Sequence, residues 1–316
     1  MNDTRLRPLG RSDLRVSRLC LGGNVFGWTA DEAASFRILD AYVAAGGTIV
    51  DTADSYSAWA EGHRGGESET VIGAWLDQRG RPDDLVIATK VSQHPEFRGL
   101  SGANVRAAAH ASLKRLGVET IDLYYAHFDD HDTPLAESAE AFSSLVDEGV
   151  IRAIGLSNHR PDRIREWLDV CADRGLHAPV CVQPHYNLVE RGIEADLVPL
   201  ARERGLALLP YFGLAKGFLT GKYQPGGADV DSPRAASARS YLDHPRGERV
   251  LAALEEVSAE RGVASAAVAL AWLADRPGVT SAIASARDLA QVQDLLPVIG
   301  LELTGDESAR LTEASA

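Results

Sequence analysis

The chain has 316 residues, of which 45% are hydrophobic and 24% are charged, and this composition is typical of a soluble globular protein. The formal net charge of −13 argues against non-specific binding to nucleic acid and against attraction to anionic membranes, because both require a positive surface. An anionic ligand would therefore have to be bound by local cations.

Short apolar runs alternate with helix-like segments along the chain. Before the first run, residues 4–17 (TRLRPLGRSDLRVS) predict a hairpin that turns near Gly10–Asp13 and covers the floor of the fold. The runs have the length of buried strands, and they lie at residues 18–23, 46–53, 85–91, 121–128, 151–158, 180–184, 206–212 and 279–285.

Capping residues predict where several of the helices begin. Thr29 and Glu32 have the spacing of a capping box, and Gly46 follows that helix as a stop signal. Thr133 is expected to be an N-cap with Pro134 at the first helical position. Near the end of the chain, Thr304 and Glu307 form a second expected capping box.

Eight strands that are each followed by a helix indicate parallel pairing, because parallel strands need crossover connections of this length. The closure that accounts for all of them is an α/β fold, a (β/α)8 TIM barrel with an N-terminal β-hairpin and long loops on its C-terminal face. We expect one domain over residues 1–316. A long segment at about 213–245, rich in Gly, Ser and Pro, interrupts the seventh unit and is expected to be a functional loop.

Polar side chains follow the ends of these strands, where barrel enzymes carry their chemistry. Asp51 and Tyr56 follow the second run, while Lys90 and His127 end the third and the fourth. An ammonium beside a phenol lowers the pKa of the phenol, so Lys90 could make Tyr56 a proton donor. Asp51 could hold Lys90 in place, and His127 could hydrogen-bond a carbonyl oxygen. This set is suited to protonating an oxyanion as it forms, beside a hydride donor.

The chain resembles the aldo-keto reductase family along nearly its whole length. The matching segments are GGTIVDTADSY, LVIATK, IDLYYAHFDDHDTPLAE, IRAIGLSN, VQPHYN, PYFGLAKGFLTGKY and AIASARDLAQV. The resemblance implies a (β/α)8 barrel that transfers a hydride between a nicotinamide cofactor, usually NADPH, and a carbonyl without a metal. It implies Asp51, Tyr56, Lys90 and His127 as the catalytic tetrad, with Tyr56 as general acid. A histidine at position 127 favours carbonyl reduction over reduction of carbon-carbon double bonds.

The same resemblance implies a cofactor site along the C-terminal half. Ser157, Asn158 and Gln183 match residues that hold the nicotinamide carboxamide, and Tyr211 matches the aromatic on which that ring stacks. The residues implied for the pyrophosphate and adenosine ends are Phe212, Leu214, Lys216, Gly217, Lys222, Ser285, Arg287 and Gln291. Trp28, Trp59 and Phe128 lie in loops expected at the mouth and are predicted to wall the substrate pocket, although packing in the core or a lid would also explain them.

Some positions depart from the family pattern. Ser57 stands where a glycine often follows the tyrosine, and Phe212 with Gly213 replaces the commoner Ser-Pro pair. Ser285 and Leu295 replace a frequent glycine and a frequent asparagine, which leaves NADH possible beside NADPH. The segment HFDDHD could suggest a metal, but the paired histidines of a metal-dependent barrel are absent from the first strand, so no metal site is expected.

The favoured function is NAD(P)H-dependent reduction of an aldehyde or ketone to an alcohol by a cytoplasmic enzyme. The cytoplasm is expected because no leader or spanning segment is seen and because Cys20, Cys171 and Cys181 suggest neither disulfides nor zinc. One alternative is a nicotinamide-binding regulatory or redox-sensing subunit of the same fold with slow turnover, and another is a hydrolase or isomerase on the same barrel. The complete tetrad favours the reductase, and the only partner it requires is a small carbonyl compound.

Overall fold

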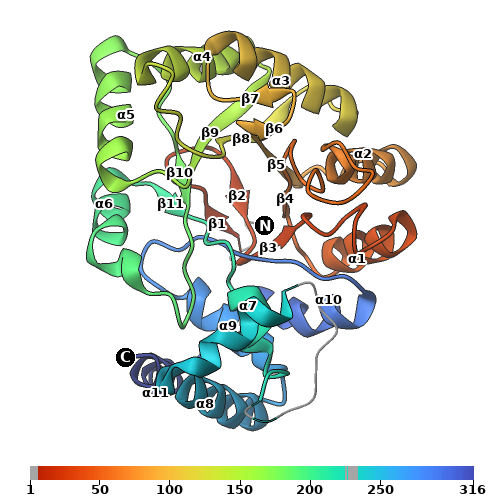
Figure 1. Ribbon diagram of the computed structural model, residues 1–316, viewed down its shortest axis with the longest axis vertical. Helices are drawn as coiled ribbons and strands as arrows, with labels where there is room; N and C mark the ends of the chain where they lie inside the picture. Colours follow the sequence, from red (N-terminus) through yellow and green to blue (C-terminus); the bar gives the residue numbers. More distant parts are fainter. Residues whose placement is uncertain (1–5, 225, 227–233) are drawn as a thin grey trace.

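The structure, a computed structural model, describes residues 6–224, 226 and 234–316 (Figure 1). In this part of the chain, parallel strands form an eight-stranded sheet in the order β11-β10-β9-β8-β5-β4-β3-β12. The strands are β3 (Leu19–Gly22), β4 (Ile49–Asp51), β5 (Val86–Val91), β8 (Ile121–Ala126), β9 (Ile151–Ser157), β10 (Cys181–Gln183), β11 (Ala207–Leu208) and β12 (Ala282–Ala284). Each lies within one of the predicted apolar runs.

Backbone hydrogen bonds join the two ends of this sheet and close it into a barrel. Leu208 of β11 accepts from the N–H of Thr280 and donates to the carbonyl of Gly278, both at 2.9 Å, and Ile283 of β12 donates to Pro210 at 3.0 Å. The predicted (β/α)8 fold is confirmed, because each of the eight strands is followed by helical structure before the next.

The helices surround the sheet in chain order, as Figure 1 shows. They are α1 (Glu32–Ala44), α2 (Glu67–Arg79), α3 (Gly102–Leu116), α4 (Leu135–Asp147), α5 (Pro161–Arg174), α6 (Leu197–Arg204), α8 (Pro245–Arg261), α9 (Ser265–Ala274), α10 (Leu289–Leu295) and α11 (Gly305–Ala314). The described part of the long loop forms a 3-10 segment (Ala215–Thr220) and the short helix α7 (Ala235–Arg239). Residues 225 and 227–233 of that loop lie outside the description.

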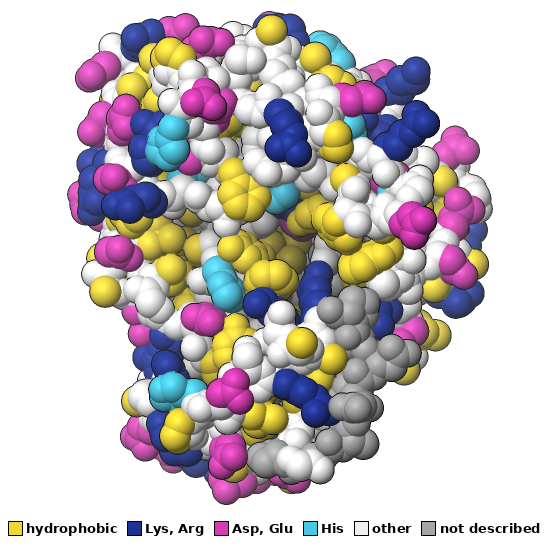
Figure 2. All heavy atoms as spheres, viewed as in Figure 1, with side chains coloured by type: hydrophobic (Ala, Val, Ile, Leu, Met, Phe, Trp, Pro, Cys, Tyr) yellow, Lys and Arg dark blue, Asp and Glu magenta, His cyan; other side chains and the backbone are white. Residues whose placement is uncertain are grey.

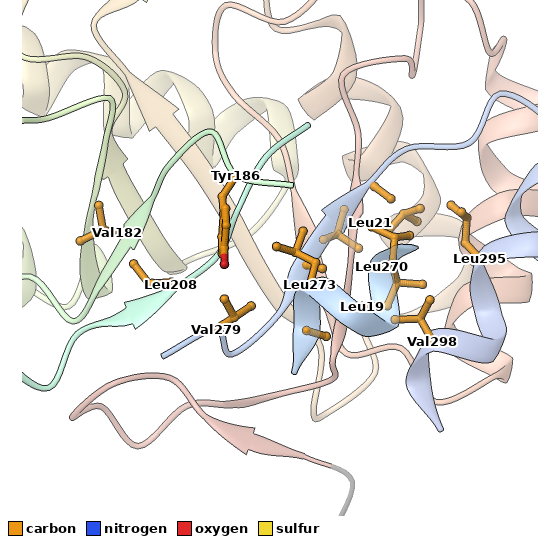
Figure 3. Close-up of a cluster of buried hydrophobic side chains, with 14 of the residues drawn as sticks. Leu19, Leu21, Val182, Tyr186, Leu208, Leu270, Leu273, Val279, Leu295 and Val298 are labelled. Atoms are coloured by element: carbon orange, nitrogen blue, oxygen red, sulfur yellow. The ribbon is translucent and has the colours of Figure 1, made fainter. Parts of the chain in front are cut away.

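Two apolar clusters hold these layers together. The larger lies between the strands and the helices, and Figure 3 shows a part of it in which Leu19 and Leu21 of β3 lie beside Leu270 and Leu273 of α9. The smaller fills the inside of the barrel and includes Ile49, Ala88 and Cys181.

The predicted N-terminal hairpin is confirmed, with β1 (Arg7–Pro8) paired antiparallel to β2 (Arg15–Val16). Its side chains Leu9, Leu14 and Val16 are buried and belong to the inner cluster. Because they add to that cluster from below, the hairpin covers the floor of the barrel, as the sequence predicted.

Two predicted helix starts are wrong, although the helices themselves exist. Asp31 is the N-cap of α1 and accepts from the N–H of Ala34 at 2.7 Å, so the side chain of Thr29 does not cap this helix. At α4, Pro134 is the N-cap, and the hydroxyl of Thr133 donates instead to Asp130 at 2.7 Å. The capping box of Thr304 and Glu307 is confirmed.

Side chains alternate between the two clusters along each strand, because a strand has a period of two. In β5, Val86 and Ala88 belong to the inner cluster and Ile87 and Val91 to the outer one. Lys90 is therefore in register with the inward-facing residues.

Among the described residues, no single helix has the length and apolar character needed to cross a membrane. Helices α8 and α9 taken together have the length and apolar composition of a membrane span, but they meet at a bend of 100°.

Candidate active site

A cavity of about 810 Å³ opens at the C-terminal ends of the strands. Figure 2 shows it as a hollow near the middle of the face, with hydrophobic side chains inside and basic ones along the side nearest the grey residues. Every predicted site residue lines this cavity except Lys90, which lies beneath Tyr56. The structure therefore brings the sequence-predicted residues together, from both halves of the chain.

Asp51, Tyr56 and Lys90 form one buried hydrogen-bonded group. The Nζ atom of Lys90 donates to Asp51 Oδ2 at 2.5 Å, to the Tyr56 hydroxyl at 2.9 Å and to the carbonyl of Thr52 at 2.8 Å. Lys90 has 0% and Asp51 2% of its surface exposed. All three donors of the ammonium are thus used, and its charge is paired, as a buried charge must be.

Protonation in this group follows from burial and from the close opposite charges. Burial raises the pKa of Tyr56 to about 12, and the positive charge of Lys90 only partly opposes this effect. The predicted lowering of the Tyr56 pKa is therefore wrong in net direction for the protein alone, because desolvation of the phenolate outweighs the ammonium. Burial acts to lower the pKa of Lys90, but Asp51 and Tyr56 outweigh it and raise that pKa. At neutral pH the group holds a phenol and an ammonium.

His127 follows β8 and stands at the wall of the cavity, with its ring 6.1 Å from the Tyr56 ring. Burial, together with the charge of Lys90, holds the pKa of His127 well below its usual range, so the imidazole is neutral. Nδ1 is buried and has no hydrogen-bond partner among the described residues. Nε2 is therefore the nitrogen that can reach a ligand.

Ser157, Asn158 and Tyr211 form a polar wall beside this group. Tyr211 donates from its hydroxyl to Asn158 Oδ1 at 2.8 Å, and Asn158 Nδ2 donates to the carbonyl of His127 at 2.9 Å. Neither Ser157 nor Asn158 caps α5, whose N-cap is Arg160. Ser157 and Asn158 therefore line the cavity and do not cap the helix that follows them.

Gln183 contacts the charged group directly, which the sequence did not reveal. Its Nε2 donates to Asp51 Oδ1 at 2.7 Å, so both carboxylate oxygens of Asp51 are hydrogen-bonded. The reason is the period of β10, in which Cys181 and Gln183 face inward, while Val182 faces the helices.

The far end of the cavity is cationic. Lys216, Lys222 and Arg287 line it as predicted, and Arg234 joins them without having been predicted. Two of these cations lie near the Phe212 ring, with Lys216 Nζ at 5.9 Å and the Arg234 guanidinium at 5.3 Å from its centre. Burial and the charge of Arg287 lower the pKa of Lys222. Cations held this close together in a chain of charge −13 mark a place for an anion.

Aromatic side chains wall the opposite end. The Trp28 and Trp59 rings meet edge to face at 5.4 Å, and Trp59 is 6.1 Å from the Tyr56 ring. Trp59 is 54% and Phe128 41% exposed, which is unusual for side chains of this size. Trp28, Trp59 and Phe128 all line the cavity.

Other lining residues were missed in the sequence. Asn24 lies just after β3 and accepts from the Ser285 hydroxyl, so the same strand-end rule could have identified it. For Arg234 there was no such signal, since it lies inside the long segment at about 213–245, away from any predicted strand end.

The aspartate-rich segment after His127 is structural. Asp129 accepts from Arg163 at 2.8 Å, and Asp130 accepts from the N–H of Leu100 at 2.7 Å. No group of three or more residues suited to metal binding occurs in the described ranges.

Comparison with known proteins identifies relatives over almost the full length. The model of the "Aldo/keto reductase family" matches residues 18–316. An "Uncharacterized oxidoreductase YrpG" of Bacillus subtilis is 35% identical, with 93% of this chain and 91% of that protein covered. A "Probable voltage-gated potassium channel subunit beta" of Oryza sativa is 33% identical, with 94% and 93% covered. A "Norsolorinic acid reductase B" of Aspergillus parasiticus is 30% identical, with 96% and 82% covered.

Proposed function

This chain belongs to the aldo/keto reductase family, and from that premise we propose that it reduces an aldehyde or ketone to an alcohol with NADPH, Tyr56 being the proton donor. One observation carries the proposal. The buried ammonium of Lys90 contacts both Asp51 and the Tyr56 hydroxyl, at 2.5 and 2.9 Å, at the wall of a cavity large enough for a cofactor and a substrate.

The residues of the cavity fit a dinucleotide with phosphates. Lys216, Lys222 and Arg287 supply three positive charges at one end, which is one more than a pyrophosphate needs and leaves a cation for a 2′-phosphate. This charge count supports NADPH over NADH. At the other end, Ser157, Asn158 and Gln183 present hydroxyl and amide groups suited to a carboxamide. When bound, the nicotinamide would supply the hydride.

The chain's own residues would manage the proton. The Tyr56 hydroxyl donates to Asp51 Oδ2 at 3.3 Å in the protein alone, and this long bond is weak enough to be exchanged for one to a carbonyl oxygen. Neutral His127 can donate a second hydrogen bond to that oxygen through Nε2. As the proton leaves, Lys90 stands 2.9 Å from the new phenolate and stabilises it.

The mouth supports an apolar carbonyl compound as substrate. Trp28, Trp59 and Phe128 offer ring faces and edges to a ligand. An apolar carbonyl compound would bury this exposed aromatic surface.

Substitution of Tyr56 tests the proposal. We expect Tyr56→Phe to lower kcat with a carbonyl substrate by about 10² or more, since it removes the general acid, and to leave the NADPH Kd, measured by fluorescence, unchanged. Tyr241→Phe is the matched control, because its hydroxyl bonds Glu190 and it does not line the cavity. Unchanged turnover in Tyr56→Phe would refute the role of Tyr56.

The relatives named as potassium channel subunits favour a second candidate, a cofactor-binding regulatory subunit. Such a protein would bind NADPH but turn over carbonyls slowly, and it would co-purify with a partner. Turnover of a carbonyl panel at several per second or more, typical of enzymes, would exclude it.

A further inference from the structure

Two buried threonines lie on the opposite side of the strands from the active site. Thr52 follows Asp51 in the chain, and Thr89 precedes Lys90. Because side chains alternate along a strand, these threonines face outward toward α2, where Asp51 and Lys90 face inward. Thr52 also contacts Lys90 directly, since its carbonyl accepts from Nζ at 2.8 Å.

The first turn of α2 holds both threonines through two consecutive residues. The Thr52 hydroxyl donates to Ser68 Oγ at 2.8 Å, and Ser68 Oγ donates to the carbonyl of Gly23 at 2.7 Å. The Thr89 hydroxyl donates to Glu69 Oε1 at 2.6 Å. Thr52, Ser68, Glu69 and Thr89 are all 0% exposed. Ser68 therefore holds β4, and Glu69 holds β5.

Glu69 is itself held by a charge partner. Its Oε2 accepts from Arg115 Nε of α3 at 2.6 Å. Asp54 is also fully buried near this pair, and burial together with Glu69 holds the pKa of Asp54 well above its usual range, against smaller opposite effects of Arg115, the Ser55 backbone and Lys90. The guanidinium of Arg115 thus pairs with the buried side chain of Glu69 and holds it in place.

We propose that Glu69 is a positioning residue for the proton donor, because through Thr89 it fixes the end of β5 at the place where Lys90 reaches Asp51, Thr52 and Tyr56 together. The ammonium has three donors and uses all of them. A shift of the backbone at Lys90 relative to β4 lengthens at least one of these bonds, and the contact to Tyr56 is the longest. The inference rests on the proposed function, because Tyr56 is the donor only if the protein is a reductase.

Thr89 offers the sharper test, because valine has nearly the same shape but lacks the hydroxyl. We expect Thr89→Val to lower kcat about tenfold, while the KM for the carbonyl and the Kd for NADPH stay the same, because the loss affects only the proton-transfer geometry. Thr89→Ser keeps the hydroxyl and should retain wild-type kcat. If Thr89→Val does not fold, Thr89→Cys replaces the hydroxyl by a weak donor and is expected to lower kcat in the same way.

A second measurement separates positioning from general damage. Protein labelled with 13C at the tyrosine Cζ atoms reports the hydrogen bonds of Tyr56, whose signal is identified by its absence in Tyr56→Phe. The Tyr56 signal should move in Thr89→Val and stay in place in Thr89→Ser. If both the signal and kcat are the same in all folded variants, the proposal is overturned. If the wild type turns over no carbonyl, the proposed function fails, but the Tyr56 signal still decides whether Glu69 and Thr89 position this residue.

Discussion

Replacement of Asp54 by asparagine tests the electrostatics behind the site. Asp54 is 0% exposed, and neither of its carboxylate oxygens has a hydrogen-bond partner among the described residues. Its pKa is held well above the usual aspartate range, first by burial and then by Glu69. The folded protein should therefore keep a proton on Asp54 at a pH at which the unfolded chain has lost it.

The sign and the size of the effect follow from that difference. In the wild type, the stability contributed by the raised pKa is complete below the unfolded value of about 3.9 and is lost as the pH rises toward the folded pKa. Within that window, the free energy of unfolding falls by about 1.4 kcal/mol per pH unit because of this group. Asparagine carries no such proton. The variant should thus gain on the wild type as the pH rises above about 4, by about 1.4 kcal/mol per pH unit until the folded pKa of Asp54 is reached.

Urea denaturation at a series of pH values measures this difference directly. Asp77→Asn is the matched control, because it makes the same change at an exposed position of the same helix α2. The reasoning would be refuted if the free energies of unfolding of the wild type and Asp54→Asn changed in parallel with pH. It would also be refuted if the wild type became more stable relative to the variant as the pH rises.

Four further substitutions have distinct expected outcomes. Ser57→Gly should raise the free energy of unfolding by about 1 kcal/mol in urea, because Ser57 has φ +72° and a buried hydroxyl without a partner among the described residues. Arg287→Ala should weaken NADPH about tenfold or more in calorimetric titrations and change NADH little, which corresponds to about 1.4 kcal/mol for the 2′-phosphate. Trp59→Ala should raise the KM for an aromatic carbonyl without changing the melting temperature, since the ring is 54% exposed. Arg261 and the Thr304 cap lower the pKa of Glu307 to about 2, so the stability difference between wild type and Glu307→Gln should be present at neutral pH and disappear in acid melts as the pH falls toward 2.

The fold and the charged group could be predicted because both follow from local rules. Strands and helices alternate in the sequence, and the ends of parallel strands meet at one face. Asp51, Lys90 and His127 each stand at such an end, so their meeting required no knowledge of loop paths. The roles of these residues in catalysis remain predictions.

Features that depend on loop paths or on burial could not be predicted. Arg234 lines the cavity from inside the long segment at about 213–245, and no sequence motif reveals the course of that segment. Thr29 and Asp31 are both residue types that favour the N-cap position. The backbone N–H of Thr29 still bonds to the Val25 carbonyl in the preceding loop, so the helix begins only after Asp31. The shift of the Tyr56 pKa was predicted with the wrong sign. The positions of residues in the sequence indicate which charges lie near Tyr56, but not how completely the folded protein excludes water from it.

The raised pKa of Tyr56 bears on the proposed reaction. At about 12 it leaves the residue almost entirely as phenol at neutral pH, with roughly 10⁻⁵ of the molecules as phenolate. Reduction of a carbonyl needs the phenol as donor, whereas oxidation of an alcohol needs the phenolate as acceptor. Under the proposed function, the protein alone thus holds Tyr56 in the form that reduction requires. In that reaction Lys90 would act mainly after the proton has left, when its contact at 2.9 Å would meet a full negative charge instead of a dipole. We therefore expect burial to keep the proton on Tyr56 until a substrate oxygen develops charge, and the ammonium to limit the cost of releasing it.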